Sequence, residues 1–153
     1  ATGKAILYAT PCMSDRFFLD TNILVYARDS RFPEKQVIAD KLVQTAFAGG
    51  LGRVSRQVLH EFYVTTTRKL SPGLDKKEAR EAVAALEYLE TMPRQDELLK
   101  YAWSIEDRFQ LSFWDALIIA AALLEECSVI YTEDLQPGLQ VDNLRIVNPF
   151  VTK

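Results

Sequence analysis

Short apolar runs and long stretches of helical periodicity alternate along this chain. Three runs are typical of buried strands, at residues 17–19, 129–131 and 144–147. Apolar residues recur at helical spacing in the segments between the first two runs, at residues 33–47, 55–63, 75–89, 97–109 and 116–124. Strands that alternate with helices in this way predict an α/β fold with a mostly parallel central sheet.

Capping residues mark where several of these helices begin and end. Ser55 is a favoured N-cap residue, and Asp75 with Glu78 forms the pattern of a capping box. The pair Gly49-Gly50 is typical of a glycine C-cap. A short polar turn and a short helix are expected directly after the first strand, and the helix at residues 116–124 is apolar on nearly every face, which predicts a central, buried position.

The composition limits the classes of protein to consider. A length of 153 residues fits one domain with its own core. The chain is 48% hydrophobic and 25% charged, as expected of an ordinary soluble protein, and no apolar stretch is long enough to span a bilayer. Its formal net charge of −3 excludes a broadly basic protein that holds nucleic acid by bulk attraction. Any nucleic-acid function must therefore depend on a local site.

The two cysteines, Cys12 and Cys127, lie at opposite ends of the chain. Their number and spacing predict neither a disulfide framework nor a zinc site, and they favour a reducing cytoplasm. Residues 1–14 lack the features of a signal peptide and are interpreted as an N-terminal extension or a remnant of cloning. We expect one domain over residues 15–153.

Four acidic residues are the candidates for chemistry. Asp20 and Asp134 follow predicted strands, whereas Glu61 and Asp115 lie on predicted helices. Each has a local structural alternative: Asp20 and Asp134 suit turns, Asp115 could complete a capping box with Ser112, and Glu61 could be a solvated helix residue. Strand ends and the helices packed on a parallel sheet meet at one edge, so the four side chains are expected to converge there.

Carboxylates that converge repel one another and raise one another's pKa unless a cation compensates their charge. A divalent metal ion is the simplest compensation. Mg²⁺ and Mn²⁺ take oxygen ligands, so a carboxylate cluster without Cys or His suits them better than zinc. Such a metal activates water and stabilises charge during phosphodiester hydrolysis. The sequence therefore favours a metal-dependent hydrolase of phosphodiester bonds.

Four motifs over residues 16–150 resemble those of the PIN-domain family, in particular the VapC-like ribonuclease toxins of bacterial and archaeal type II toxin–antitoxin pairs. Phe-Leu-Asp-Thr-Asn at residues 18–22 resembles the first strand of the family with its acidic residue, and residues 57–63 resemble the helix that bears the second. Residues 111–116 and 131–134 resemble the third and fourth motifs. The four motifs occur in the order and at the separations usual in the family.

The resemblance implies a Rossmann-like α/β/α sandwich of three layers, Mg²⁺ or Mn²⁺ as cofactor, and cleavage of RNA. It also implies a frequent homodimer and neutralisation by a small antitoxin encoded beside the toxin. The implied metal ligands and catalytic residues are Asp20, Glu61, Asp115 and Asp134. The implied polar supports, which orient carboxylates or substrate, are Asn22, Ser112 and Thr132. Glu133 adjoins the fourth acid, but the Thr-x-Asp spacing favours Asp134.

Several further residues carry weaker signals. Arg53, Arg56 and Arg68 could contact RNA phosphates, although a solvated basic face explains them equally well. Trp103 and Trp114 could stack on bases, but their helical contexts favour packing in the core or at an interface. His60, the single histidine, is interpreted as an exposed helix residue and not as part of a nucleophilic triad.

Two other functions remain open. The first is a PIN-like interaction module that binds a partner through its acidic groove without turnover. The second is a Mg²⁺-dependent phosphoacceptor signalling domain, which also gathers aspartates at strand ends. That architecture normally has a lysine after its last sheet strand, where this chain offers only Arg145, and it does not use helix residues such as Glu61 and Asp115 as metal ligands.

Overall fold

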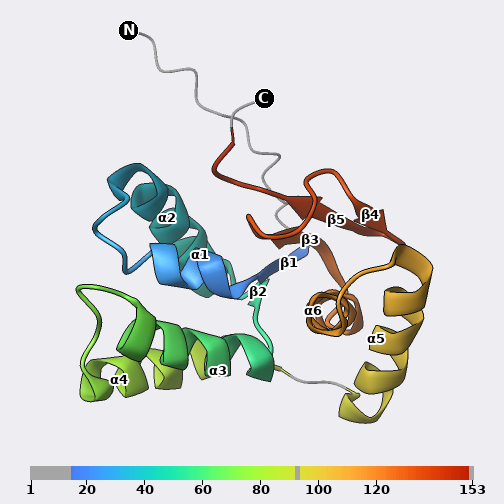
Figure 1. Ribbon diagram of the computed structural model, residues 1–153, viewed down its shortest axis with the longest axis horizontal. Coiled ribbons are helices and arrows are strands. Elements are labelled where there is room, and N and C mark those ends of the chain that lie inside the picture. The colour runs from blue at the N-terminus through green and yellow to red at the C-terminus, as the bar shows by residue number, and fades with distance from the viewer. Residues whose placement is uncertain (1–14, 92–93, 152–153) are drawn as a thin grey trace, which may run out of the picture.

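The computed structural model describes residues 15–91 and 94–151. Five strands form a single sheet in the order β2-β1-β3-β5-β4 (Figure 1). Their bounds are Arg16–Leu19 for β1, Gly52–Arg53 for β2, Cys127–Tyr131 for β3, Gln140–Val141 for β4 and Leu144–Val147 for β5. All neighbouring pairs are parallel except β4 and β5, which are antiparallel. The predicted mostly parallel sheet is confirmed.

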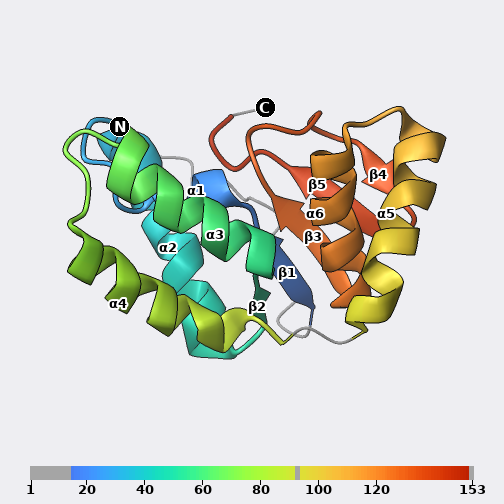
Figure 2. The same ribbon diagram turned by 60° about the horizontal axis from the view of Figure 1, so that its bottom comes forward.

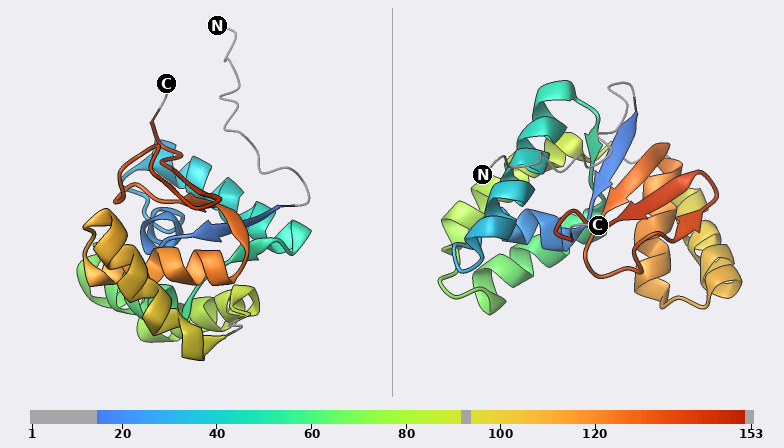
Figure 3. Two further views of the ribbon diagram at one scale, coloured as in Figure 1. Left: turned by 90° about the vertical axis from the view of Figure 1, so that its right-hand side faces the viewer. Right: turned by 90° about the horizontal axis from the view of Figure 1, so that it is seen from above.

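The helices cover both faces of this sheet. They are α1 (Thr21–Tyr26), α2 (Pro33–Gly49), α3 (Arg56–Val64), α4 (Lys76–Leu86), α5 (Gln95–Phe109) and α6 (Phe113–Leu124), with a π-helical turn at Thr65–Lys69 and a 3₁₀ turn at Glu87–Leu89. Figure 3 shows α1 and α2 on one side of the strands and α5 and α6 on the other. The fold is therefore the three-layer α/β/α sandwich that the sequence predicts.

The core forms where α6 packs on the central strands. Phe18 and Ile130 of the strands and Ile119 of α6 are fully buried. Each buried side chain of this size contributes roughly 1.5–3 kcal/mol relative to an exposed one. The nearly all-apolar α6 lies between the sheet and α5, which confirms its predicted central position.

The predicted caps set the helix boundaries. Ser55 and Ser112 accept backbone N–H groups at the starts of α3 and α6, and Asp75 with Glu78 closes the capping box of α4. Gly50 ends α2 at a φ of 67°, a conformation that favours glycine. Gly52 is needed for another reason, because a Cβ there would lie 2.1 Å from the Cβ of Ala46 in α2. Glycine thus lets α2 approach β2.

Three features of the chain differ from the predictions or lie outside them. The strand β4 was not predicted, and the helical pattern at residues 75–89 divides into α4 and a 3₁₀ turn. The predicted extension at residues 1–14 lies outside the described residues. Among the described residues, no helix combines the length and apolar character needed to cross a membrane.

Candidate active site

Two neighbouring parallel strands, β1 and β3, end at the same edge of the sheet, called here the carboxyl edge. The backbone N–H of Asp20, just after β1, donates to the carbonyl of Tyr131, the last residue of β3, at 3.1 Å. The Thr132–Asp134 segment follows directly. Asp20 and Asp134 are therefore brought together from positions more than 100 residues apart in the sequence.

Asp20 serves both as a helix cap and as a site residue. One carboxylate oxygen accepts the backbone N–H of Thr21 at 2.7 Å, which caps α1, and the other accepts the Thr132 hydroxyl at 2.7 Å. Burial raises the pKa of Asp20 from 3.8 to about 6. This value already includes the bonds from Thr132 and Thr21, which lower the pKa, and the smaller effect of the charges of Asp134 and Glu61, which raise it. The cap and the acidic cluster thus share one side chain.

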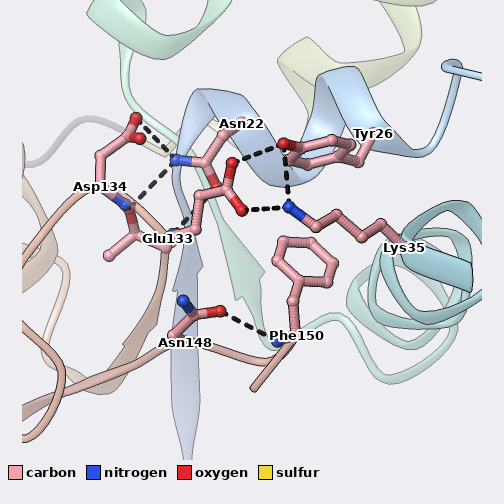
Figure 4. Close-up of polar contacts among 8 residues, drawn as sticks. Asn22, Tyr26, Lys35, Glu133, Asp134, Asn148 and Phe150 are labelled. Atoms are coloured by element: carbon pink, nitrogen blue, oxygen red, sulfur yellow. Dashed lines mark hydrogen bonds and ion pairs between the residues drawn. The ribbon is translucent and has the colours of Figure 1, made fainter. Parts of the chain in front are cut away.

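Asn22 connects the two strand ends (Figure 4). Its Nδ2 lies 3.0 Å from Asp134 Oδ2 and 3.1 Å from Thr132 Oγ1, and its Oδ1 accepts the backbone N–H of Glu133 at 3.2 Å. The Thr132 hydroxyl also accepts the backbone N–H of Asp134 at 3.1 Å. Asn22 and Thr132 therefore contact the carboxylates that they are predicted to support.

Glu61 faces the same cluster from α3. Its Oε2 accepts the Thr21 hydroxyl at 2.6 Å, and its Oε1 accepts Gln57 Nε2 at 2.9 Å. The sequence analysis did not assign Thr21 or Gln57 to the site. Gln57 lies four residues before Glu61, a helical spacing that brings side chains together and could have identified it. Thr21 lies beside Asp20 in the first motif but had no separate signal.

Asp115 lies in the first turn of α6, where its backbone N–H donates to Ser112 Oγ at 3.1 Å. Its half-buried carboxylate makes no hydrogen bond within the described residues, so the reciprocal half of a capping box is not formed. Ser112, predicted to orient a carboxylate or the substrate, acts as the N-cap of α6 instead. Among the described residues, the carboxylate of Asp115 therefore has no contact that would give it a role in stabilising the fold.

Glu133 points away from the cluster of acids. Its carboxylate accepts Lys35 Nζ at 2.8 Å and the hydroxyl of Tyr26 (Figure 4). The Lys35 ammonium also lies 4.6 Å from the ring centroid of Tyr26 and 5.3 Å from that of Phe150, and its bond to Glu133 raises the pKa of Lys35. This arrangement favours Asp134 over Glu133 as the fourth site residue.

The acids offer suitable donors for a hard metal ion but do not form a finished metal site. Within the described residues, no Lys or Arg makes an ion pair with Asp20, Glu61, Asp115 or Asp134. No three Asp, Glu, His or Cys side chains there converge closely enough to coordinate one ion. The donor chemistry fits Mg²⁺ or Mn²⁺, and the carboxylates would have to draw together around the ion.

Comparison with known proteins agrees with this arrangement. The family model of the PIN domain matches residues 17–137, which include all four acids. The chain belongs to the PIN-domain family. No curated protein matches the chain at a significant level.

Two solved structures have a fold similar to that of this PIN domain. One is a toxin–antitoxin complex from Klebsiella pneumoniae, with a TM-score of 0.61, 16% identity, and coverage of 86% of this chain and 96% of that chain. The other is VapBC2 from Rickettsia felis bound to a DNA fragment from its promoter, with a TM-score of 0.57, 20% identity, and coverage of 85% and 96%. At these identities the likeness concerns the fold.

The arginines predicted to contact substrate lie in different environments of the PIN domain. Arg53 extends to the end of α6, where its Nε lies 3.5 Å from Glu125 Oε2, roughly 15 Å along the helix from Asp115. That position lies away from the carboxyl edge, and a contact of Arg53 with RNA stays a prediction. Arg56 is paired with Glu90 at 2.7 Å, and Arg68 is exposed beyond the end of α3.

Packing in the core or at an interface was predicted for the two tryptophans of the PIN domain, and neither of them lies in the core. Trp103 is 49% exposed on α5, and Trp114 is 63% exposed in the first turn of α6. His60 is exposed on α3, as predicted. Helical periodicity placed these residues on helices but could not identify the face that each helix packs against the core.

Proposed function

We propose that this PIN domain is a metal-dependent endoribonuclease, with Asp20, Glu61, Asp115 and Asp134 as metal ligands and catalytic residues. The observation that carries the proposal is the carboxyl-edge cluster of four acids that pair with no cation of residues 15–91 and 94–151, and in which Asp20 is buried and its pKa is raised to about 6. A protein gains no stability from such a cluster unless something compensates the charge. The hard oxygen donors favour Mg²⁺ or Mn²⁺ as that compensation.

The residues around the cluster have roles that follow from their contacts. Asn22 and Thr132 hold Asp20 and Asp134 in position, and Thr21 bonds Glu61. When bound, the ion would lower the pKa of a water molecule and stabilise the charge on the phosphate. Because the pKa of Asp20 is about 6, this carboxyl group is largely ionised and able to act as a ligand at neutral pH.

We further propose RNA as the substrate and a role as the toxin of a toxin–antitoxin pair. Membership of the PIN family and the likeness of fold to the two toxin–antitoxin structures support this role. A small antitoxin is then the expected partner, a homodimer the expected assembly, and the cytoplasm the expected location.

A non-catalytic PIN module is the second candidate, and it has one observation in its favour. Among the described residues, no three acidic side chains lie close enough together to hold one metal ion. Retention of metal binding without RNA cleavage would support that candidate. A phosphoacceptor domain is not compatible with the family to which the chain belongs.

Cleavage of a mixed pool of structured RNA tests the proposal. The purified protein is incubated with Mg²⁺, with Mn²⁺ or with EDTA, beside its Asp20→Asn variant. The matched control is Asp107→Asn, because Asp107 is an exposed acid on α5 whose side chain makes no described contact. We expect cleavage with either metal, none with EDTA or in Asp20→Asn, and full activity in the control. Cleavage that persists in EDTA would contradict a metal-dependent mechanism.

A further inference from the structure

A surface cleft of about 650 Å³ runs between α3 and α6 and reaches the candidate active site. Figure 2 shows the two helices side by side. Glu61 belongs both to this cleft and to the acidic cluster, and Trp114, on the opposite wall, immediately precedes Asp115. Any strand held at the acids for cleavage would therefore pass the mouth of the cleft.

Trp114 presents a large aromatic surface to this cleft. Its side chain is 63% exposed, although an indole gains considerable free energy when it is buried. The Phe113 ring packs against it edge to face, with centroids 5.3 Å apart at 67°, which restrains the indole. An aromatic side chain that is exposed yet restrained is typical of a binding surface.

Apart from Glu61 and Arg56, the side chains that line the cleft are apolar, or are polar and formally uncharged. Leu98 of α5 and Leu117 of α6 supply apolar surface, and His60 and Gln57 supply polar groups. Arg56, the cation of the lining, is paired with Glu90 at 2.7 Å, so its charge is already partly compensated. Gln57 Oε1 has no hydrogen-bond partner within the described residues. These features suit a flat, partly polar group better than a phosphate.

We propose that this cleft binds the base of an unpaired nucleotide beside the scissile phosphodiester, stacked on Trp114. The inference rests on the proposed function and specifies its substrate as single-stranded RNA at this position. The cleft volume lies within the range of small-ligand sites, roughly 300–1,000 Å³. Stacking of a base on an aromatic side chain is the usual means by which proteins hold single strands without reading their sequence.

The two tryptophans allow a direct test by fluorescence. In an Asp20→Asn background that prevents cleavage, Trp103→Phe leaves Trp114 as the sole tryptophan, excited selectively over the tyrosines, and Trp114→Phe leaves Trp103. Each protein is titrated, with Mg²⁺ present, with a pool of short single-stranded RNA and with a ribose-phosphate chain of equal length that lacks bases. Trp103 is the matched control, since it is similarly exposed but does not line the cleft.

We expect saturable quenching of Trp114 by RNA, little change at Trp103, and no response to the chain without bases. Trp114→Leu in the otherwise native protein should raise KM by between about fivefold and a hundredfold, the range of one stacked base, and change kcat little. Trp103→Leu should leave both constants unchanged.

Normal cleavage by Trp114→Leu, without quenching of Trp114 by RNA, would overturn the base-binding cleft and leave the nuclease intact. Absence of cleavage by the native protein, together with absence of RNA binding, would overturn the proposed function as well. Equal quenching by the chain without bases would also overturn the proposal, since the cleft would then respond to the backbone. Quenching of Trp114 by a protein partner and not by RNA would identify the cleft as a protein-binding groove and contradict the proposal.

Discussion

The acidic side chains at the two edges of the sheet differ in their electrostatic partners. At the amino edge, where β1 and β3 begin, Glu126 pairs with Arg16 at 3.1 Å and Glu125 lies 3.5 Å from Arg53. At the carboxyl edge, Glu133 pairs with Lys35, but the four candidate acids differ from it. Asp20, Glu61 and Asp134 have hydroxyl and amide partners, and none of these three or Asp115 makes an ion pair within the described residues.

This difference separates acids that stabilise the fold from acids that are available to a ligand. The amino edge contains the larger cavity, about 930 Å³, yet each acid of its lining is paired with an arginine: Glu126 with Arg16, Glu125 with Arg53 and Glu97 with Arg94. Its charges largely compensate one another, so its size does not make it an active site. The four candidate acids at the carboxyl edge have no such paired cation within the described residues, and a bound metal ion would compensate their charge.

The largest expected effect is that of Asp115→Asn on RNA cleavage. The variant keeps the shape of the side chain and the backbone bond to Ser112 but removes a negative charge that makes no structural contact. We expect the cleavage rate to fall roughly a thousandfold, about 4 kcal/mol, with an unchanged thermal midpoint of unfolding. A variant that unfolds early would instead show that Asp115 is needed to start α6.

At the amino edge, Glu125→Leu should reduce stability and leave the active site unchanged. The variant leaves the largely buried side chain of Arg53, which is 12% exposed, without its acid, which typically costs about 3 kcal/mol. Urea unfolding measures this loss, with the exposed Glu126→Gln as the control for a surface pair. If the two variants were equally stable, the buried pair would not stabilise this edge.

The contribution of Asp20 to the stability of the metal-free protein should fall as the pH rises from about 4 to about 7. The pKa of Asp20 is raised from 3.8 to about 6 in the folded state, so the folded protein binds this proton more tightly than the unfolded chain. Stability is then highest below the unfolded pKa and is lost through the folded one, by at most about 3 kcal/mol.

Urea unfolding in EDTA across this pH range measures the loss. Asp20→Asn should show a shallower dependence because it cannot ionise, and Mg²⁺ should restore the stability of the native protein at pH 7. An equal slope in the two proteins would mean that Asp20 does not carry the raised pKa.

The smallest expected effect on cleavage is that of Glu133→Gln, and its comparison with Asp134→Asn tests which of the two adjacent acids belongs to the site. Lys35 and Tyr26 donate to different carboxylate oxygens of Glu133, so the single amide oxygen of Glu133→Gln keeps only one of the two bonds. Both contacts lie away from the cluster of acids, so we expect cleavage to fall only a few-fold, about 1 kcal/mol. Asp134→Asn should be far more severe. Equal defects in steady-state cleavage would reverse the assignment of the fourth acid.

Local signals predicted much of the fold, and they predicted that the candidate residues at the two strand ends lie together. Caps such as Ser55 and Asp75 depend on neighbouring residues, and the convergence of Asp20 with Asp134 follows from parallel strands that end at one edge. The two-residue strand β4 is too short to leave a recognisable pattern.

Features that depend on side-chain direction could not be predicted in this way. The sequence does not show that Arg53 extends to Glu125 or that Lys35 binds Glu133, because both contacts join segments distant in the chain. The exposure of Trp114 likewise depends on how α6 is rotated against α3 and the sheet.

Calorimetric titration with Mn²⁺ tests the central claim most directly, because it asks whether the uncompensated acids bind a divalent cation. The native protein is compared with Asp20→Asn at the carboxyl edge and with Glu126→Gln at the amino edge. We predict that Mn²⁺ binds the native protein and Glu126→Gln alike, and that binding is lost in a correctly folded Asp20→Asn. Equal binding by all three proteins, or by none, would contradict the claim that the carboxyl edge is a metal site.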